Sequence, residues 1–219
     1  YIVHLAAKAD LDGKEYSDYD INIESVKNLI KFCKSNKSVK RMIFASTMLV
    51  NQTGHNSKDI YNYNANTLYG KSKKAGEKLI LNNQDIPTDF CIIRPTSIWG
   101  EWFGEPYKNF FNYVLSEKYF HPGSSSSKKT FGYVGNTVYQ IEKLLFAEKK
   151  RIRNKIFYIG DMPPIKISQW ANEIAKIGNV NKPKTIPIYI FKFLLRNNIL
   201  SFLIYFFISS LKFIISPSG

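Results

Sequence analysis

The stretch Met42-Ile43-Phe44-Ala45-Ser46-Thr47 decides the fold, because a short apolar run that ends in two hydroxyl residues is typical of a buried strand meeting a ligand crevice. Two further runs read as strands, at residues 1–7 and 89–93. Apolar side chains at helical spacing lie between them, over residues 19–34 and 65–81. The alternation of strands and helices predicts an α/β fold with a parallel sheet and crossover helices.

Tyr69 and Lys73 lie four residues apart in the second predicted helix, so their side chains share one face. An ammonium one turn from a phenol favours the phenolate, and we expect Lys73 to lower the pKa of Tyr69 from about 10 toward neutral. A phenol tuned in this way serves as a general acid or base. Thr47, just past the carboxyl end of its strand, would point its hydroxyl into the same crevice. Thr47, Tyr69 and Lys73 are therefore the predicted catalytic residues.

A second Tyr-x-x-x-Lys pair, Tyr139 with Lys143, has no strand ending in hydroxyl residues before it. In a chain this rich in tyrosine and lysine about two such pairs are expected by chance. We interpret the second pair as structural, part of an amphipathic helix. The competing interpretation of the first pair is a solvated lysine-rich helix face with an interfacial tyrosine.

The composition is that of a globular chain. With 219 residues, of which 44% are hydrophobic and 22% charged, it is long enough for one core and a smaller lobe. The net charge of +14 favours an acidic partner, such as a phosphorylated small molecule or an anionic membrane surface. No nucleic-acid motif accompanies the basic residues, so a nucleic-acid partner is not expected. Two cysteines and three scattered histidines indicate a reducing, cytoplasmic compartment and no metal site.

Five short motifs follow one another in the first 100 residues. They are Ile2-Val3-His4-Leu5-Ala6-Ala7, Tyr19-Asp20-Ile21-Asn22-Ile23, Phe44-Ala45-Ser46-Thr47, Tyr69-Gly70-Lys71-Ser72-Lys73 and Arg94-Pro95-Thr96-Ser97-Ile98-Trp99-Gly100. In this order they resemble the extended short-chain dehydrogenase/reductases, the NAD-dependent epimerase/dehydratase family, whose members act largely on nucleotide sugars. The resemblance runs from residue 2 to about residue 160 and implies a Rossmann-like doubly wound parallel sheet with a smaller substrate-binding lobe.

The resemblance also implies a role for individual residues. Those matching the family's contacts to NAD or NADP are Leu5, Ala6, Ala7, Asn22, Tyr69, Lys73 and Thr96. Those matching its contacts to the nucleotide-sugar substrate are Thr47, Ser97 and Lys129. In such an enzyme the phenol takes a proton from a sugar hydroxyl, the threonine aligns that oxygen, and the lysine also holds the nicotinamide ribose. A homodimer is implied as well.

Three departures from the family pattern refine this expectation. No Gly-x-x-Gly-x-x-Gly loop is present to hold the pyrophosphate, so the chain is interpreted as lacking the first βαβ unit and as inactive in this form. Met48 and Leu49 replace the acidic pair of the sugar dehydratases, which leaves epimerisation or ketone reduction. Lys129 stands where an arginine usually meets the substrate diphosphate, keeping the charge but losing the bidentate fork.

Three segments are expected from these patterns. Residues 1–100 form a partial Rossmann-like dinucleotide-binding domain, and residues 101–185 form a mixed substrate-binding lobe with a returning strand and helices. Residues 186–219 form an apolar helical tail, whose uncharged stretch is shorter than the roughly twenty residues that a membrane-spanning helix needs. Peripheral membrane contact through residues 186–215 and burial in a subunit contact or missing lobe remain as alternatives.

Two other functions stay open alongside the epimerase or ketoreductase. One is a membrane-associated oxidoreductase resembling the hydroxysteroid dehydrogenases, which shares the Tyr/Lys chemistry and would account for the apolar tail. The other is a non-catalytic remnant that acts as a membrane-surface or interaction module, because the phosphate-binding loop is missing from the chain.

Overall fold

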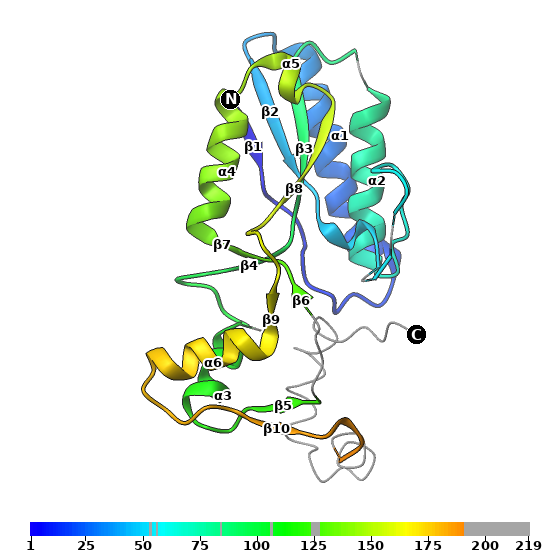
Figure 1. Ribbon diagram of the computed structural model, residues 1–219. Helices are drawn as coiled ribbons and strands as arrows, with labels where there is room; N and C mark the ends of the chain where they lie inside the picture. The colour runs from blue at the N-terminus through cyan, green and yellow to red at the C-terminus, as the bar shows by residue number, and fades with distance from the viewer. Residues whose placement is uncertain (53, 56, 84, 106, 124–127, 191–219) are drawn as a thin grey trace. The chain divides into compact units, whose positions relative to one another are not determined.

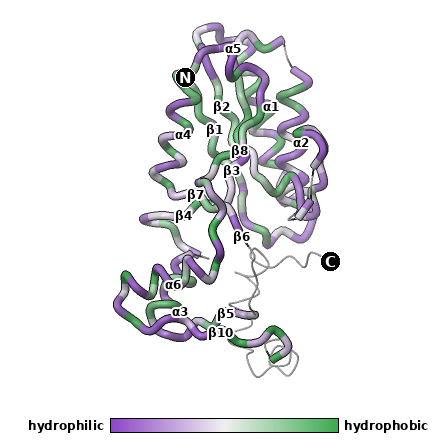
Figure 2. Tube along the Cα trace, in the orientation of Figure 1, coloured by the Kyte–Doolittle hydropathy of each residue, from purple (hydrophilic) through white to green (hydrophobic). Residues whose placement is uncertain are grey.

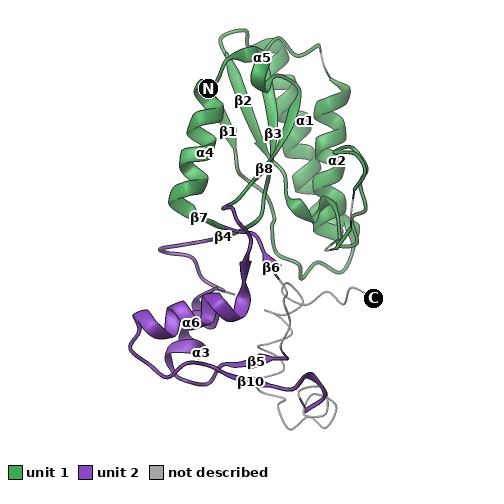
Figure 3. Ribbon diagram, viewed as in Figure 1, with its two compact units in different colours: residues 1–98, 132–160 green, residues 99–131, 161–219 purple. Residues whose placement is uncertain are grey.

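The computed structural model describes residues 1–52, 54–55, 57–83, 85–105, 107–123 and 128–190. The chain divides into two compact units, residues 1–98 with 132–160 and residues 99–131 with 161–219 (Figure 3). Most of the predicted apolar tail lies outside the described residues. Among the described residues, no helix is both long enough and apolar enough to cross a bilayer.

Unit 1 is built on a sheet of four parallel strands in the order β1-β2-β3-β8 (Figure 1). The strands are β1 (Ile2–His4), β2 (Arg41–Ala45), β3 (Asp89–Pro95) and β8 (Lys155–Ile159). Because β8 pairs with β3, residues 132–160 belong to unit 1, although the sequence analysis groups them with the second lobe. The predicted parallel α/β sheet is thus confirmed, and the chain enters this unit twice.

Helices cover both faces of this sheet. α1 (Asp20–Ser35) and α2 (Leu68–Asn82) lie on one face and α4 (Val134–Phe146) on the other (Figure 1). Alternate strand residues supply two separate cores, because successive side chains of a strand point to opposite faces. Met42 and Phe44 pack in the α1/α2 core, whereas Ile43 and Ala45 pack in the α4 core. The strands are accordingly the most hydrophobic part of the unit (Figure 2).

Short elements connect these layers. They are the 3-10 turns η1 (Tyr16–Tyr19) and η2 (Met48–Val50), the single-turn helix α5 (Lys149–Ile152), and the strands β4 (Ser97–Trp99) and β7 (Phe131–Tyr133), which pair with each other. The first strand is shorter than predicted, since it ends at His4, and Leu5, Ala6 and Ala7 follow it as exposed chain. The strand prediction over residues 1–7 was therefore wrong for its last three residues.

Unit 2 packs two helices around an aromatic core. The helices are α3 (Tyr107–Leu115) and α6 (Ile167–Ile177), and two small sheets accompany them: β5 (Phe120–Pro122) with β10 (Lys184–Ile186), and β6 (Lys128–Lys129) with β9 (Ile165–Lys166). Trp170 of α6 packs against this core, with its ring 4.4 Å from that of Phe131 and 5.1 Å from that of Phe110. The rings of Tyr107, Phe110 and Phe111 recur at helical spacing in α3, so one face of that helix is aromatic.

Candidate active site

Thr47 directly follows β2 and caps the turn η2. Its side-chain oxygen accepts a hydrogen bond from the backbone N–H of Leu49 at 3.2 Å. The Thr47 side chain also lies near enough to the Tyr69 phenol to lower the pKa of that phenol. The predicted meeting of these two side chains is present in the structure.

The first turn of α2 packs closely against η2. Thr67 caps the helix by accepting from the backbone N–H of Gly70 at 3.0 Å. A β-carbon at Gly70 would collide with the carbonyl oxygen of Leu49, so only glycine permits this approach of helix and turn. This contact brings Tyr69, the neighbour of Gly70, to the hydroxyl of Thr47.

The predicted acidity of Tyr69 is contradicted. Burial raises the pKa of Tyr69 to about 12, and the hydrogen bond from Thr47 opposes this rise only in part. The ammonium of Lys73 is not among the causes of the shift, although the two residues are one helical turn apart. In the protein alone the phenol therefore stays protonated at neutral pH. Burial destabilises the phenolate by more than Thr47 stabilises it.

The side chain of Lys73 is buried in unit 1. The residue is 2% exposed, and its Nζ lies 4.5 Å from the centre of the Phe44 ring. Burial lowers the pKa of Lys73 to about 8, against an opposing effect of the Glu77 carboxylate. Among the described residues, no group accepts a hydrogen bond from this ammonium. Three buried donors are thus available to a ligand with hydroxyl groups.

Asn22 links two of the segments predicted to bind a cofactor. It is 3% exposed. Its carbonyl oxygen accepts from the backbone N–H of Lys8 at 2.7 Å, and its amide donates to Lys8 O at 3.0 Å and to Ser72 Oγ at 3.1 Å. The side chain thereby ties the exposed segment that follows β1, residues 5–8, to α2. Its observed role is that of a brace between these segments.

The remaining predicted ligand contacts lie elsewhere in the fold. Thr96 and Ser97 follow the end of β3, where both are partly buried and the Thr96 backbone N–H donates to Ile159 O at 2.9 Å. Lys129 belongs to β6 of unit 2 and extends over the ring of Phe131, 5.2 Å from its centre. Burial lowers the pKa of Lys129 to about 8.

Sequence reasoning missed two polar groups beside Lys73. His4, at the end of β1, stacks on Phe44 with ring centres 5.5 Å apart, and burial and then the charge of Lys73 lower its pKa. Glu77 lies one turn beyond Lys73 on α2 and is fully buried. The sequence signal for Glu77 is its spacing: four residues after Lys73, on the face that α2 turns toward the sheet.

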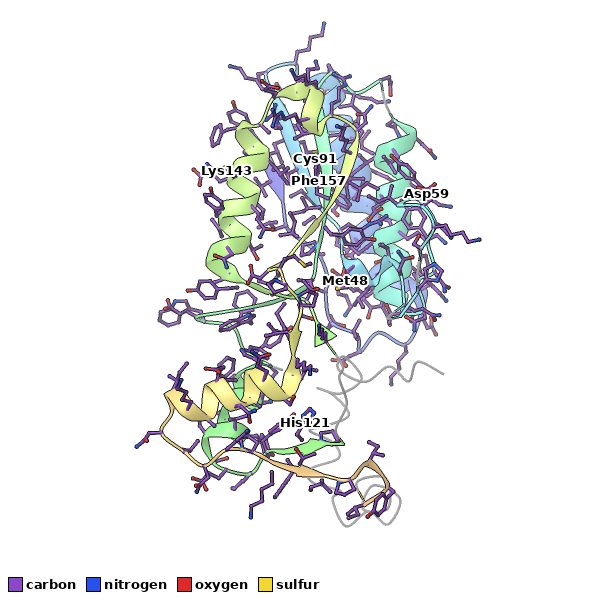
Figure 4. The ribbon with its side chains drawn as sticks, in the orientation of Figure 1. Met48, Asp59, Cys91, His121, Lys143 and Phe157 are labelled. Carbon is purple, nitrogen blue, oxygen red and sulfur yellow. The ribbon has the colours of Figure 1, made fainter. Side chains whose placement is uncertain are left out.

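The second Tyr-x-x-x-Lys pair has the surface character expected of it. Tyr139 is 58% exposed on α4, and the ammonium of Lys143 lies over its ring at 4.9 Å. Lys143 lies on α4, away from Met48 and the turn η2 (Figure 4). The identical spacing therefore produces a buried site in α2 and an exposed pair in α4.

The sequence profile of the 3-beta hydroxysteroid dehydrogenase/isomerase family matches residues 1–190. The chain belongs to this family. The predicted resemblance to the epimerase/dehydratase type of short-chain dehydrogenase/reductase is thereby confirmed.

Two curated relatives fit this assignment. The chain is 26% identical over 174 residues to the N-acetyl-alpha-D-glucosaminyl-diphospho-ditrans,octacis-undecaprenol 4-epimerase of Escherichia coli O157:H7, covering 75% of this chain and 50% of the relative. It is 27% identical over 191 residues to the 3-beta-hydroxysteroid dehydrogenase of Mycolicibacterium neoaurum, covering 79% of this chain and 51% of the relative. The chain therefore spans about half the length of both proteins.

Solved structures share the fold. The UDP-N-acetylglucosamine 4-epimerase of Bacillus cereus superposes with a TM-score of 0.69 at 22% identity, over 84% of this chain and 65% of that one. The UDP-glucuronic acid 4-epimerase of the same organism, solved with UDP-glucuronic acid and NAD, gives 0.68 at 22% identity over 85% and 62%. RMD from Pseudomonas aeruginosa, solved with NADPH, gives 0.69 at 15% identity over 85% and 68%. These matches confirm the Rossmann-like fold class.

Proposed function

We propose that this protein is a cytoplasmic NAD(P)-dependent epimerase or ketoreductase acting on nucleotide sugars, with Thr47, Tyr69 and Lys73 as its catalytic residues. The observation that carries the proposal is the contact between the Thr47 hydroxyl and the Tyr69 phenol, one helical turn from a buried lysine. Family membership and the epimerases among its relatives support the same chemistry. We also propose that the protein forms a homodimer, on the basis of the family resemblance alone.

The residues around Lys73 fit a dinucleotide. The Lys73 ammonium has buried donors that no described residue fills, which suits the paired hydroxyls of a ribose. Leu5, Ala6 and Ala7 are exposed and two of them are small, so their backbone is open to a ligand at the end of β1. A bound nicotinamide supplies the acceptor or donor of a hydride.

The protein's own groups move and hold the proton. Tyr69 takes the proton of a substrate hydroxyl, and Thr47 holds the oxygen of that hydroxyl in line with the phenol. Because burial raises the pKa of Tyr69 to about 12, the phenol needs an added positive charge before it acts as a base near neutral pH. Lys73 positions the ligand, and Lys129 is proposed to bind the substrate diphosphate.

The substrate test compares two kinds of diphosphate-linked sugar. Among the relatives named above, one epimerase acts on a sugar linked to polyprenol diphosphate and two act on UDP-sugars. Because the chain contains no Gly-x-x-Gly-x-x-Gly loop, the assay uses the chain extended at residue 1 by a βαβ unit that carries one. Incubating this extended protein with NAD and either UDP-N-acetylglucosamine or a short polyprenyl-diphosphate N-acetylglucosamine, followed by separation of the C4 epimers, distinguishes them. Turnover of the UDP-sugar supports the proposal, and turnover of the lipid-linked sugar alone would replace the substrate class.

The catalytic assignment is tested by Tyr69→Phe with Tyr139→Phe as its matched control. Loss of the Tyr69 hydroxyl is expected to lower kcat by about 10²–10⁴-fold, the usual contribution of general acid–base catalysis. Tyr139 belongs to the exposed pair on α4, so its variant is expected to retain parental turnover. Equal turnover in the two variants would remove Tyr69 from the mechanism.

A hydroxysteroid oxidoreductase is the second candidate, favoured by the family description and by the M. neoaurum relative. It uses the same Thr47, Tyr69 and Lys73 but needs no cation for a diphosphate. NAD-dependent oxidation of a 3β-hydroxysteroid, unaffected by Lys129→Met, would establish this candidate in place of the first.

A further inference from the structure

A buried ion pair adjoins the candidate site in unit 1. Arg94, at the end of β3, donates from Nε to Glu77 Oε1 at 2.9 Å and from Nη2 to Glu77 Oε2 at 2.7 Å. Both side chains are fully buried. Such a pair is weak support for stability, because removing two charges from water costs about as much as their attraction returns. Its presence one turn from Lys73 suggests another role.

Further contacts hold this pair in one geometry. The hydroxyl of Tyr63 donates to Glu77 Oε2 at 2.8 Å, so the carboxylate accepts three hydrogen bonds. The third guanidinium nitrogen of Arg94, Nη1, donates to the Tyr158 hydroxyl at 3.0 Å. The rings of Tyr63 and Tyr158 also lie 5.2 Å and 5.4 Å from the guanidinium carbon. Arg94 and Tyr63 thus hold the Glu77 side chain in one position.

The ion pair of Arg94 and Glu77 has no net charge, but its carboxylate raises the pKa of Lys73. Glu77 is the charged group that raises the pKa of Lys73 against the larger opposing effect of burial. Lys73 and Glu77 share one face of α2, whereas Arg94 reaches Glu77 from β3. The negative end of the pair is therefore the end that acts on the ammonium.

We propose that Glu77, held by Arg94 and Tyr63, is a positioning residue that keeps the buried Lys73 ammonium charged and so ready to bind a ligand. The groups that face Lys73 are His4 from β1, the uncharged Phe44 ring from β2, and Tyr69 and Glu77 from its own helix. Among these, Glu77 alone carries a negative charge at neutral pH. The consequence for catalysis rests on the proposed function, but the charge state of Lys73 does not.

The test follows the protonation of Lys73 directly, without any assay of activity. In protein labelled with ¹³C at lysine, the Lys73 Cε resonance, assigned by its absence from Lys73→Arg, is recorded as a function of pH. Glu77→Gln, which keeps the shape and removes the charge, is expected to lower the Lys73 midpoint by on the order of one pH unit, the effect of a single nearby charge. Glu77→Asp, which keeps the charge, is expected to restore the midpoint toward the parental value.

Glu24→Gln serves as the matched control, since Glu24 is exposed on α1 and pairs with Lys27. It is expected to leave the Lys73 midpoint unchanged. If Glu77→Gln does not fold because Arg94 is left unpaired, the double variant Glu77→Gln with Arg94→Met removes both charges and spares that cost. It is expected to lower the midpoint too. A parental midpoint in either folded variant, or equal shifts in the Gln and Asp variants, would overturn the proposal, whereas the enzymatic function would be judged by Tyr69→Phe as before.

Discussion

Burial lowers the pKa of two lysines to about 8, Lys73 in unit 1 and Lys129 in unit 2, and their surroundings differ. In unit 1, Lys73 lies over Phe44 and within the field of Glu77. In unit 2, Lys129 lies over Phe131, at the edge of the aromatic core, and burial is the cause of its shift. The two ammonium groups therefore have similar pKa values, although a carboxylate acts on Lys73 and an aromatic ring lies beside Lys129. The difference is that the charge of a hydrogen-bonded carboxylate, Glu77, acts on Lys73, whereas Lys129 lies over a ring of the aromatic core of unit 2.

The largest expected effect is a loss of stability when the aromatic core of unit 2 is disrupted. Trp170→Ala removes the ring that contacts Phe131 and Phe110, and we expect it to destabilise the protein by about 3–5 kcal/mol because the core cannot refill the space. Chemical denaturation followed by fluorescence measures the loss. Trp102→Ala is the matched control, because Trp102 is fully exposed and its removal is expected to change stability by less than about 0.5 kcal/mol. Similar losses in both variants would show that the stability of this core does not depend on the Trp170 ring.

A second experiment separates the two lysines by ligand. Under the proposed function, Lys73→Met is expected to weaken NAD(H) binding by roughly 10–100-fold, the value of a hydrogen bond to a charged group. Lys129→Met is expected to leave cofactor affinity intact and to weaken binding of UDP alone. Cofactor fluorescence and UDP calorimetry measure the two affinities, with Lys78→Met, an exposed residue of α2, as the control. The reverse pattern would exchange the roles assigned to the two lysines.

The smallest effect is a pH dependence of stability. Burial lowers the pKa of Lys73 from 10.5 to about 8, so between these values the unfolded chain holds a proton that the folded chain has released. Stability therefore rises with pH across this window, and below about pH 8 the full cost of burying the ammonium remains. We expect Lys73→Met to flatten this rise by on the order of 1–2 kcal/mol, measured by urea unfolding between pH 7.5 and pH 9.5.

The same slope is expected from Lys129, and Lys129→Met provides the comparison within one protein. The upper limit of pH is chosen because Tyr69, whose pKa is raised to about 12, acts in the opposite direction once the unfolded phenol ionises above about pH 10. An unchanged slope in both variants would mean that neither ammonium is buried as the structure shows.

The sequence was sufficient for the sheet and for the contact at its edge. The apolar run of β2 and the spacing of Tyr69 on α2 are local patterns, and they predicted the parallel strands and the meeting of Thr47 with the phenol. The acidity of Tyr69 was not predictable in this way. Spacing places Lys73 one turn away, but the depth of burial, which dominates the pKa, depends on how the whole unit packs.

The polar network was also beyond local patterns. Glu77 and Arg94 are 17 residues apart and lie on different elements, so only the packing of α2 against β3 pairs them. The apolar pattern of residues 1–7 also overestimated the length of β1, which ends at His4.

The amide of Asn22 couples two parts of the site that are distant in the sequence. Its side chain hydrogen-bonds to the main chain of Lys8 and to the hydroxyl of Ser72, the residue next to Lys73. A shift of the segment after β1 is consequently transmitted to the helix that carries the proposed base. Mutagenesis at position 22 would disturb both together, so a variant there reports on their alignment and never on one of them alone.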